Sequence, residues 1–297
     1  MRIGTGILAA LAIVGACAPK DKSSTASTDS AASAGSVAVA AAPAATAPAA
    51  APNVVTVHAT DFAFKSAPDS IPAGMTTFDL VNDGHAPHHL IVVRLDSGKT
   101  MKDLQTELAK PVAPAAWASF QGGPNASDPG TTSNATLDLQ PGSYVMMCLV
   151  DVPGGVPHFV KGMIRPFTVT ASTGLSAPPP ASDVAIKLYD YNFDVSKPLT
   201  AGKHTFMVTN SAAQMHEVEL VHLAPGKTVD DLLKWLGKPA GPPPGSLVGG
   251  AAPFTKTTNY FSAELTPGNY AMICFVPDAR DGKPHFMHGM TKTITVS

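Results

Sequence analysis

Two stretches of this sequence share one order of Cys, His and Met: YVMMCLVDVPGGVPHFVKGM at residues 144–163 and YAMICFVPDARDGKPHFMHGM at residues 270–290. Each contains one Cys, then Pro-His-Phe, then Gly-Met, with four residues between the His and the Met. A further His lies far upstream of each stretch, in NDGHAPHH and in NSAAQMHE. The two sets are His88, Cys148, His158 and Met163, and His216, Cys274, His285 and Met290. The chain therefore carries one set of potential metal ligands twice.

The two copies are similar along their whole length. VTVHATDFAF near the start of the first copy is matched by VAIKLYDYNF in the second, and PAGMTTFDLVN is matched by TAGKHTFMVTN. Shared order over a period of about 127 residues indicates a duplicated unit. We therefore expect a first domain at residues 53–171, a Pro-rich linker at 172–182 and a second domain at 183–297.

The local sequence of each copy predicts strands. Short apolar runs are separated by Pro and Gly, which number 28 and 25 in the chain, and this pattern favours β structure over helix. The one strong helix signal in each copy starts at Thr100 and Thr228, where an Asp three positions later completes a capping-box-like start. Several short strands and one short helix per copy predict an all-β fold of two tandem Greek-key β-sandwich domains.

The N-terminal region differs from the rest of the chain. Residues 1–17 contain an apolar run that is shorter than the roughly 20 residues needed to span a bilayer, and they are predicted to be a signal peptide. Val-Gly-Ala before Cys17 resembles the bacterial lipoprotein cleavage box, in which the Cys is lipidated; the alternative is an ordinary signal peptide cut near Ala16 or Ala18. Residues 18–52 are almost entirely Ala, Ser, Thr and Pro and are predicted to be a disordered tether. We expect the mature protein in the periplasm or at the cell surface, anchored to a membrane by lipidated Cys17.

Charge and cysteine positions narrow the function classes. The formal net charge is −2 and the sequence has no basic stripe, so nucleic acid is not expected as a partner. Cys148 and Cys274 occupy equivalent positions in the two copies, and the third cysteine lies in the N-terminal leader. One Cys per copy fits two isolated thiolate ligands better than a disulfide framework.

Strand alternation predicts which side chains face each core. Tyr144, Met146 and Cys148 share one face of their strand, and the second copy repeats this row. The thiol therefore ends an inward-facing row, at the point where the strand enters a loop.

The upstream histidines are also expected to face inward. Glu217 and Glu219 alternate with His216 and are expected to point outward, and His89 alternates with His88 and is expected at the surface. An inward His beside an inward Cys is costly to bury unless both have partners. Bound copper would be such a partner, and one Cys, two His and one Met is the ligand set of a mononuclear blue-copper site.

These motifs resemble the cupredoxin family of blue copper proteins, which includes plastocyanin and azurin. The resemblance is carried by an Asn-x-Gly-x-x-Pro-His start at residues 82–88 and by the Cys-His-Met loop at residues 148–163. In the second copy Asn210 and the matching ligands carry it, although Ala212 and Met215 replace the Gly and the Pro. The resemblance implies up to two type 1 copper sites, each with two His and a Cys in a trigonal plane and the Met as a weak axial ligand.

The gap between the Cys and the loop His departs from small cupredoxins, since it is nine residues in the first copy and ten in the second. It is closer to the type 1 site of copper nitrite reductases, which raises an enzyme hypothesis. Those enzymes and the multicopper oxidases need a His immediately before the Cys, where this chain has Met147 and Ile273. No His-Cys-His or His-x-His occurs either, so we expect that the protein is not an enzyme.

The resemblance implies a membrane-tethered electron-transfer protein, with redox proteins or a membrane-bound electron-transfer complex as partners. By the same resemblance, the loop histidines would be the ligands at the solvent edge. The apolar residues expected to form a docking patch there are Val156, Phe159, Phe286 and Met287. The alternative is a structural or accessory subunit of such a complex, with copper lost or optional. Copper storage or delivery is less well supported, because the tether contains neither Met nor His.

Overall fold

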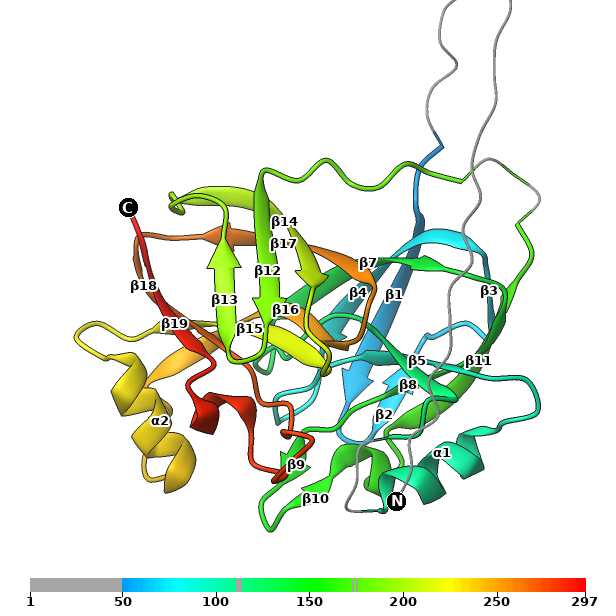
Figure 1. Cartoon of the computed structure of the whole chain (residues 1–297), viewed down its shortest axis with the longest axis horizontal. Helices are drawn as coiled ribbons and strands as arrows, with labels where there is room; N and C mark the ends of the chain where they lie inside the picture. The colour runs from blue at the N-terminus through cyan, green and yellow to red at the C-terminus, as the bar shows by residue number, and fades with distance from the viewer. Residues whose placement is uncertain (1–49, 111–113, 173, 175) are drawn as a thin grey trace, which may run out of the picture. The chain divides into compact units, whose positions relative to one another are not determined.

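The computed structural model describes residues 50–110, 114–172, 174 and 176–297. They form an eight-stranded sheet, a nine-stranded sheet, a two-stranded hairpin and two α-helices (Figure 1). The predicted signal peptide, the predicted lipidation site Cys17 and nearly all of the predicted tether lie outside the described residues. No helix in these ranges is long and apolar enough to cross a membrane.

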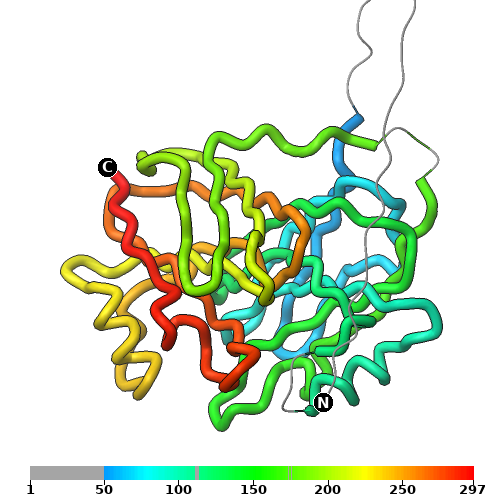
Figure 2. The backbone as a smooth tube through the Cα atoms, in the orientation of Figure 1, coloured from blue at the N-terminus to red at the C-terminus, as the bar shows by residue number. Residues whose placement is uncertain are grey.

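The described residues of the first repeat form eleven strands. They are β1 (Asn53–Thr60), β2 (Ala63–Lys65), β3 (Ser70–Pro72), β4 (Gly74–Asn82), β5 (Ile91–Leu95), β6 (Ala118–Gly122), β7 (Thr132–Leu139), β8 (Gly142–Met147), β9 (Asp151–Val152), β10 (Val156–Pro157) and β11 (Ile164–Thr170). The backbone then passes to the second repeat, which Figure 2 colours from yellow-green to red. Its strands are β12 (Val184–Tyr189), β13 (Asn192–Val195), β14 (Gly202–Asn210), β15 (His216–Leu223), β16 (Gly245–Phe254), β17 (Thr258–Leu265), β18 (Gly268–Ile273) and β19 (Thr291–Val296).

Each repeat places its strands in two sheets that enclose one core. In the first repeat, the core contains Val57 and Phe78 from one sheet and Val92 and Met146 from the other. The second repeat builds the corresponding cluster from β12, β14 and β17 on one side and β15 and β18 on the other. The predicted all-β class is confirmed, with a cupredoxin-like β-sandwich in each repeat.

Both sheets continue from one repeat into the other. In the eight-stranded sheet β17 pairs with β7 at Tyr260 and Thr136, and in the nine-stranded sheet β16 pairs with β6 at Phe254 and Gln121. Each junction is a short antiparallel contact, and side chains add to it: the Asn134 amide donates to Ser262 O at 2.8 Å and accepts from Ser262 N at 2.9 Å.

The Cys strands have the predicted phase. Tyr144 and Met146 lie in the core of the first sandwich together with Cys148, whereas Val145 and Met147 face the opposite side, where a separate cluster includes Leu104 of α1. The second repeat behaves in the same way. Each Cys strand is therefore covered on both faces, which fixes the direction of its terminal thiol.

The described residues of each repeat contain one short α-helix, as predicted. α1 (Met101–Leu108) and α2 (Val229–Gly237) start with complete capping boxes. Thr100 Oγ1 accepts a hydrogen bond from Asp103 N at 3.2 Å, and the Asp103 carboxylate accepts one from Thr100 N at 2.8 Å. Such reciprocal bonds satisfy two backbone N–H groups that a helix start leaves without partners.

Three surface predictions from strand alternation are wrong. Glu217, Glu219 and His89 do point away from the core of their own sandwich, but all three are buried. The Asn125 and Ala126 segment of the first repeat covers the two glutamates, and it contacts them by hydrogen bonds. Alternation shows on which face of a strand a side chain lies, but it does not show that a second sandwich packs against that face.

Candidate metal centres

An asparagine at the end of a strand fixes the position of each upstream His. Asn82 ends β4; its amide donates to Ala86 O at 2.9 Å and to Ser127 O at 2.7 Å, and its oxygen accepts from Gly84 N at 3.0 Å. The loop that leads to His88 is therefore held from inside.

The second copy uses the same device with a different loop sequence. The Asn210 amide donates to Gln214 O and Phe254 O, both at 2.9 Å, and its oxygen accepts from Ala212 N at 2.9 Å. The replacement of Gly and Pro in this loop leaves the asparagine bonds in place, so His216 occupies the position that His88 occupies in the first copy.

Backbone hydrogen bonds close the loop that carries the other three predicted ligands. Cys148 N donates to Met163 O at 3.1 Å, and Met163 N donates to His158 O at 3.0 Å. Gly162, with a φ of 114°, ends the short 3₁₀ turn that begins at His158, and this backbone conformation favours glycine. The corresponding bonds in the second copy are Cys274 N to Met290 O at 3.3 Å and Met290 N to His285 O at 3.0 Å.

The long gap between Cys and His forms a local excursion. In the first copy β9 and β10 pair as a small hairpin, with Pro157 opposite Asp151. In the second copy Pro284 lies opposite Pro277. Because the extra residues begin and end at this pair of neighbouring residues, the loop His still lies close to the Cys in space.

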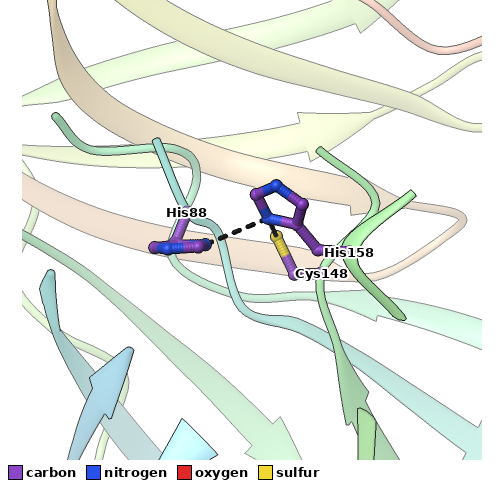
Figure 3. Close-up of side chains that lie close together, drawn as sticks. All are labelled: His88, Cys148 and His158. Atoms are coloured by element: carbon purple, nitrogen blue, oxygen red, sulfur yellow. Dashed lines mark hydrogen bonds between the residues drawn. The ribbon is translucent and has the colours of Figure 1, made fainter. Parts of the chain in front are cut away.

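The first candidate site contains Cys148, His88 and His158 (Figure 3). The Nδ1 atoms of the two histidines lie 3.1 Å apart, and Cys148 Sγ lies 3.6 Å from His158 Nδ1. All three residues are fully buried, and Met163 is a buried member of the same core cluster. The structure thus brings the predicted first set together at the end of one sandwich.

The second candidate site repeats this arrangement. Cys274 Sγ lies 3.4 Å from His285 Nδ1 and 3.9 Å from His216 Nδ1. These residues are fully buried, and Met290 lies in their core cluster. In both sites the two nitrogens and the sulfur all lie within 4.8 Å of one another.

An aspartate that the sequence analysis missed orients each upstream His. His88 Nε2 lies 3.1 Å from Asp61 Oδ1, and His216 Nε2 lies 3.0 Å from Asp190 Oδ1. Hydrogen bonds from the backbone and ring of His85, and a further one from His88, lower the pKa of Asp61 to about 2. An ionised carboxylate only accepts, so the proton of His88 is on Nε2 and the lone pair of Nδ1 faces the site. The repeated Asp in VTVHATDFAF and VAIKLYDYNF was the available signal.

The residue after each of these aspartates places an aromatic ring against the loop His. Phe62 lies edge-on to His158 with ring centroids 5.2 Å apart, and Tyr191 lies edge-on to His285 at 5.5 Å. Both residues have positive φ, 68° and 66°. Such a conformation is uncommon for an aromatic residue, and its recurrence at equivalent positions makes it part of the architecture of the site.

Burial keeps the donor atoms neutral when no cation is present. It raises the pKa of the Cys148 thiol to about 12 and that of Cys274 well above its usual range. It also lowers the pKa of His88 and His158, and that of His285 to about 4. The nitrogen lone pairs and sulfur of each site converge on a small volume without a charged partner of their own. A bound soft cation would supply that partner, so the donor set fits copper.

The second site has a buried carboxylate at a position where the first site has none. Asp278 is buried, and its Oδ2 lies 3.8 Å from His285 Nε2. Tyr191 Oη and Gln214 Nε2 donate to Asp278, and these bonds, with those from Arg280, hold its pKa well below the usual range. When the two loops are aligned on their paired residues, Asp151 with Pro157 and Pro277 with Pro284, the half-buried, uncharged Val152 takes this position in the first copy.

The loop histidines His158 and His285 are fully buried, so the expectation that they lie at the solvent edge is wrong. The predicted docking residues around them divide into exposed and covered ones. Met287 is 60% exposed, whereas Phe159 is buried in the cluster beneath α1. Val156 and Phe286 are half-buried. Val160, which the sequence analysis did not select, is 58% exposed at the position equivalent to Met287. The exposed apolar side chain beside each loop is therefore the one two residues after its His.

No protein-family model matches the chain, and no curated protein matches it. Among solved structures it is similar to reduced auracyanin from Roseiflexus castenholzii, with 21% identity over 41% of this chain and 99% of that one and a TM-score of 0.28. It is also similar to a blue copper oxidase from Nitrosomonas europaea, with 15% identity over 83% and 86% and a TM-score of 0.26. Copper nitrite reductase from the same organism gives 12% identity over 83% and 94% and a TM-score of 0.27.

The shorter of these alignments spans about the share of the chain that one repeat occupies, and the longer ones span about the share of both. The candidate sites are defined by the interatomic distances within this structure. These three solved structures are a cupredoxin and two copper enzymes with cupredoxin-like domains, and the strands of each repeat form a cupredoxin-like sandwich.

Proposed function

We propose that this protein is an electron carrier that holds a type 1 copper ion in each repeat. The observation that supports this most strongly is the duplicated cluster of one Cys and two His Nδ1 atoms, buried and within 4.8 Å of one another. His88, Cys148, His158 and Met163 would hold one ion, and the equivalent four residues of the second repeat would hold the other. Bound copper would supply one-electron redox chemistry in each site.

The chain contributes rigidity around each ligand set. The asparagine bonds, the closed Cys-His-Met loop and the carboxylate on the upstream His restrict the ligands to one geometry in either oxidation state. Little reorganisation then accompanies electron transfer. The exposed apolar side chains Val160 and Met287, each two residues after a loop His, would contact a redox partner.

Catalysis at a second copper is disfavoured by the residue before each Cys. Met147 and Ile273 are buried in the clusters beneath the helices and offer no imidazole. Neither candidate site therefore has the adjacent His that would pass electrons to a catalytic centre. We propose that the protein is not an enzyme, although solved oxidases and a nitrite reductase are among the structures with which it aligns.

The location of the protein is part of the same proposal. The apolar leader and the cleavage-box-like sequence before Cys17 support a lipid anchor outside the cytoplasm, with redox proteins or a membrane-bound complex as partners. Cys17→Ala should move the protein from the membrane fraction to the soluble fraction of cells. An unchanged membrane fraction would contradict the anchor but leave the copper sites unaffected.

Copper loading and reversible reduction test the proposed function. The reconstituted protein should show an intense thiolate-to-copper absorption band that disappears on reduction and returns on oxidation. It should not consume nitrite or dioxygen catalytically in the presence of a reductant. A colourless protein that binds no copper would favour the accessory-subunit alternative, and sustained turnover of nitrite or dioxygen would show that it is an enzyme.

A further inference from the structure

Three polar side chains from three separate loops meet beside the second candidate site. Tyr191 lies in the turn between β12 and β13, Gln214 in the loop before β15, and Asp278 in the long loop after β18. Tyr191 Oη and Gln214 Nε2 both donate to Asp278 Oδ2, the second bond at 3.2 Å, and Gln214 Nε2 also lies 3.2 Å from Tyr191 Oη. The three side chains therefore form one closed set of hydrogen bonds.

Two further residues of the long loop join the same set. Ala279 N donates to Gln214 Oε1 at 2.8 Å, and Arg280 Nη2 donates to Tyr191 Oη. Arg280 also donates to Asp278 Oδ1, from its backbone N at 2.8 Å and from its Nε at 3.2 Å. The long loop is thus bonded through three consecutive residues to the two other loops.

Each of these loops positions or supplies a ligand histidine of the second site. Tyr191 follows Asp190, whose carboxylate orients His216, and Gln214 precedes His216 by two residues. The long loop ends at His285, and the Tyr191 ring lies edge-on to this imidazole. The hydrogen bonds therefore connect the two histidines of one site through groups that are not ligands themselves.

The first repeat cannot form this set of hydrogen bonds. The asparagine that holds each upstream loop donates to Ala86 O in the first repeat and to Gln214 O in the second, which makes these two residues equivalent. The equivalents of Tyr191, Gln214, Asp278 and Ala279 are Phe62, Ala86, Val152 and Pro153. Phe, Ala and Val side chains have no donor or acceptor, and Pro has no backbone N–H.

We propose that Tyr191, Gln214 and Asp278 form a latch, a set of positioning residues that keeps the second site closed without metal, whereas the first site opens more readily. The closure depends only on the chain. Its consequence for copper, a slower release from the second site than from the first, rests on the proposed function.

The exposure of the long loop explains why a latch would matter. Residues 279–283 are exposed and belong to no strand, and such segments open most easily in folded proteins. Asp278, in contrast, is only 2% exposed. Hydrogen bonds to an ionised carboxylate are about twice as strong as those between neutral groups. Opening the loop would break several of them together and leave a charge without its partners.

Amide hydrogen exchange of the metal-free, full-length chain tests the latch. His158 N and His285 N are matched probes, because each donates to a backbone carbonyl at the start of its own loop, at 2.8 and 2.9 Å. We expect His285 N to be protected at least about tenfold more strongly than His158 N. Tyr191→Phe and Gln214→Ala, which introduce the residue types of the first repeat, should remove most of this difference and leave His158 N unchanged.

Tyr189→Phe is the matched control, because it removes a tyrosine hydroxyl that is 38% exposed in β12 and lies outside the latch. It should retain the wild-type protection of His285 N. Exchange at Met272 N, in the core strand β18, separates opening of the loop from unfolding of the repeat. It should be the same in the wild type and in the latch variants.

Copper release provides a second readout, in chains that keep one site each. Cys148→Ser retains the second site and Cys274→Ser the first, and transfer to an excess of chelator should be slower from the second. Adding Tyr191→Phe to the Cys148→Ser chain should accelerate release, although Asp278 is retained. This variant therefore separates the latch from the charge of the carboxylate.

Four outcomes would overturn the latch: equal protection of His158 N and His285 N in the wild type, unchanged protection of His285 N in both latch variants, an equal loss in Tyr189→Phe, or an equal loss at Met272 N. Release from the second site that is as fast as from the first would overturn its consequence for copper. A wild-type chain that takes up no copper would overturn the proposed function, while exchange in the metal-free chain would still decide the latch.

Discussion

The two sites have nearly the same backbone frame but different charges around it. In both repeats an asparagine holds the upstream loop, an aspartate orients the upstream His and an aromatic ring with positive φ covers the loop His. Outside this shared frame, the first site has neutral groups at two positions, Val152 and His89, where the second has Asp278 and Glu217.

Burial and hydrogen bonding determine whether each of these differing groups is charged. Burial lowers the pKa of His89 to about 3, so this ring is neutral, whereas burial raises the pKa of Glu217 to about 7. Asp278 stays ionised because Tyr191, Gln214 and Arg280 donate to it. The duplicated frame therefore preserves the ligand geometry, while substitutions one layer further out can set different redox potentials for two identical ligand sets.

Removal of the orienting aspartates should have the largest effect, a loss of copper affinity that is similar in both repeats. Asp61→Ala and Asp190→Ala each free the ring of the upstream His, and loss of such an outer partner lowers metal affinity by about 10- to 100-fold. Copper binding to each variant, measured by competition with a chelator, checks this. Asp183→Ala, which removes a carboxylate from a His that is not a ligand, should leave both affinities unchanged; a matching loss there would contradict the role in orientation.

Truncation of the asparagines that hold the upstream loops should have the next largest effect, a loss of stability. Asn82→Ala and Asn210→Ala each leave buried backbone groups without partners, at a cost of about 2 kcal/mol in the free energy of unfolding. Denaturant unfolding of the metal-free variants measures it. Asn53→Ala, at an exposed hydrogen bond to Pro72 O, should cost clearly less. If Asn210→Ala were neutral while Asn82→Ala was costly, the frames of the two repeats would not be equivalent.

Exchange of the differing charge should reverse the asymmetry between the sites. Asp278→Asn removes a negative charge beside His285, so the reduction potential of the second site should rise, on the order of 60 mV for a tenfold change in a one-electron equilibrium. Val152→Asp should lower the potential of the first site. Potentiometric titration of each variant follows both sites, and the unaltered site of each variant provides the control. A fall on Asp278→Asn would contradict the electrostatic argument.

A small pH dependence of stability should arise from the second repeat alone. A hydrogen bond to Asp183 raises the pKa of His204 above its ordinary value of about 6.5. The stabilisation from this pair is thus fully present below about pH 6.5 and is lost as the pH rises through the raised pKa. It should be less than about 1 kcal/mol because Asp183 is partly exposed. His204→Gln should flatten this part of the pH dependence of unfolding; an unchanged slope would exclude the pair as its source.

The sequence predicted the local features well and the contacts between distant segments poorly. Strand phase placed Cys148 and Cys274 in the cores, and the capping residues Thr100 and Thr228 located both helices, because these signals arise from neighbours in the chain. The burial of Glu217 was missed because it depends on packing between the repeats, which strand periodicity does not report. Asp61 and Asp190 lie in the quoted repeats, but their role appears only when β1 and β12 bring them beside the ligand histidines.

Copper stoichiometry in single-site variants tests the central claim most directly. Wild-type protein, Cys148→Ser, Cys274→Ser and the double variant should be loaded with copper under one condition, with metal content and the thiolate-to-copper band recorded for each. The account predicts two tightly bound ions in the wild type, one in each single variant with the band of the remaining site, and none with such a band in the double variant. One ion in the wild type, lost completely in one single variant and unaffected in the other, would contradict the claim that both ligand sets bind copper.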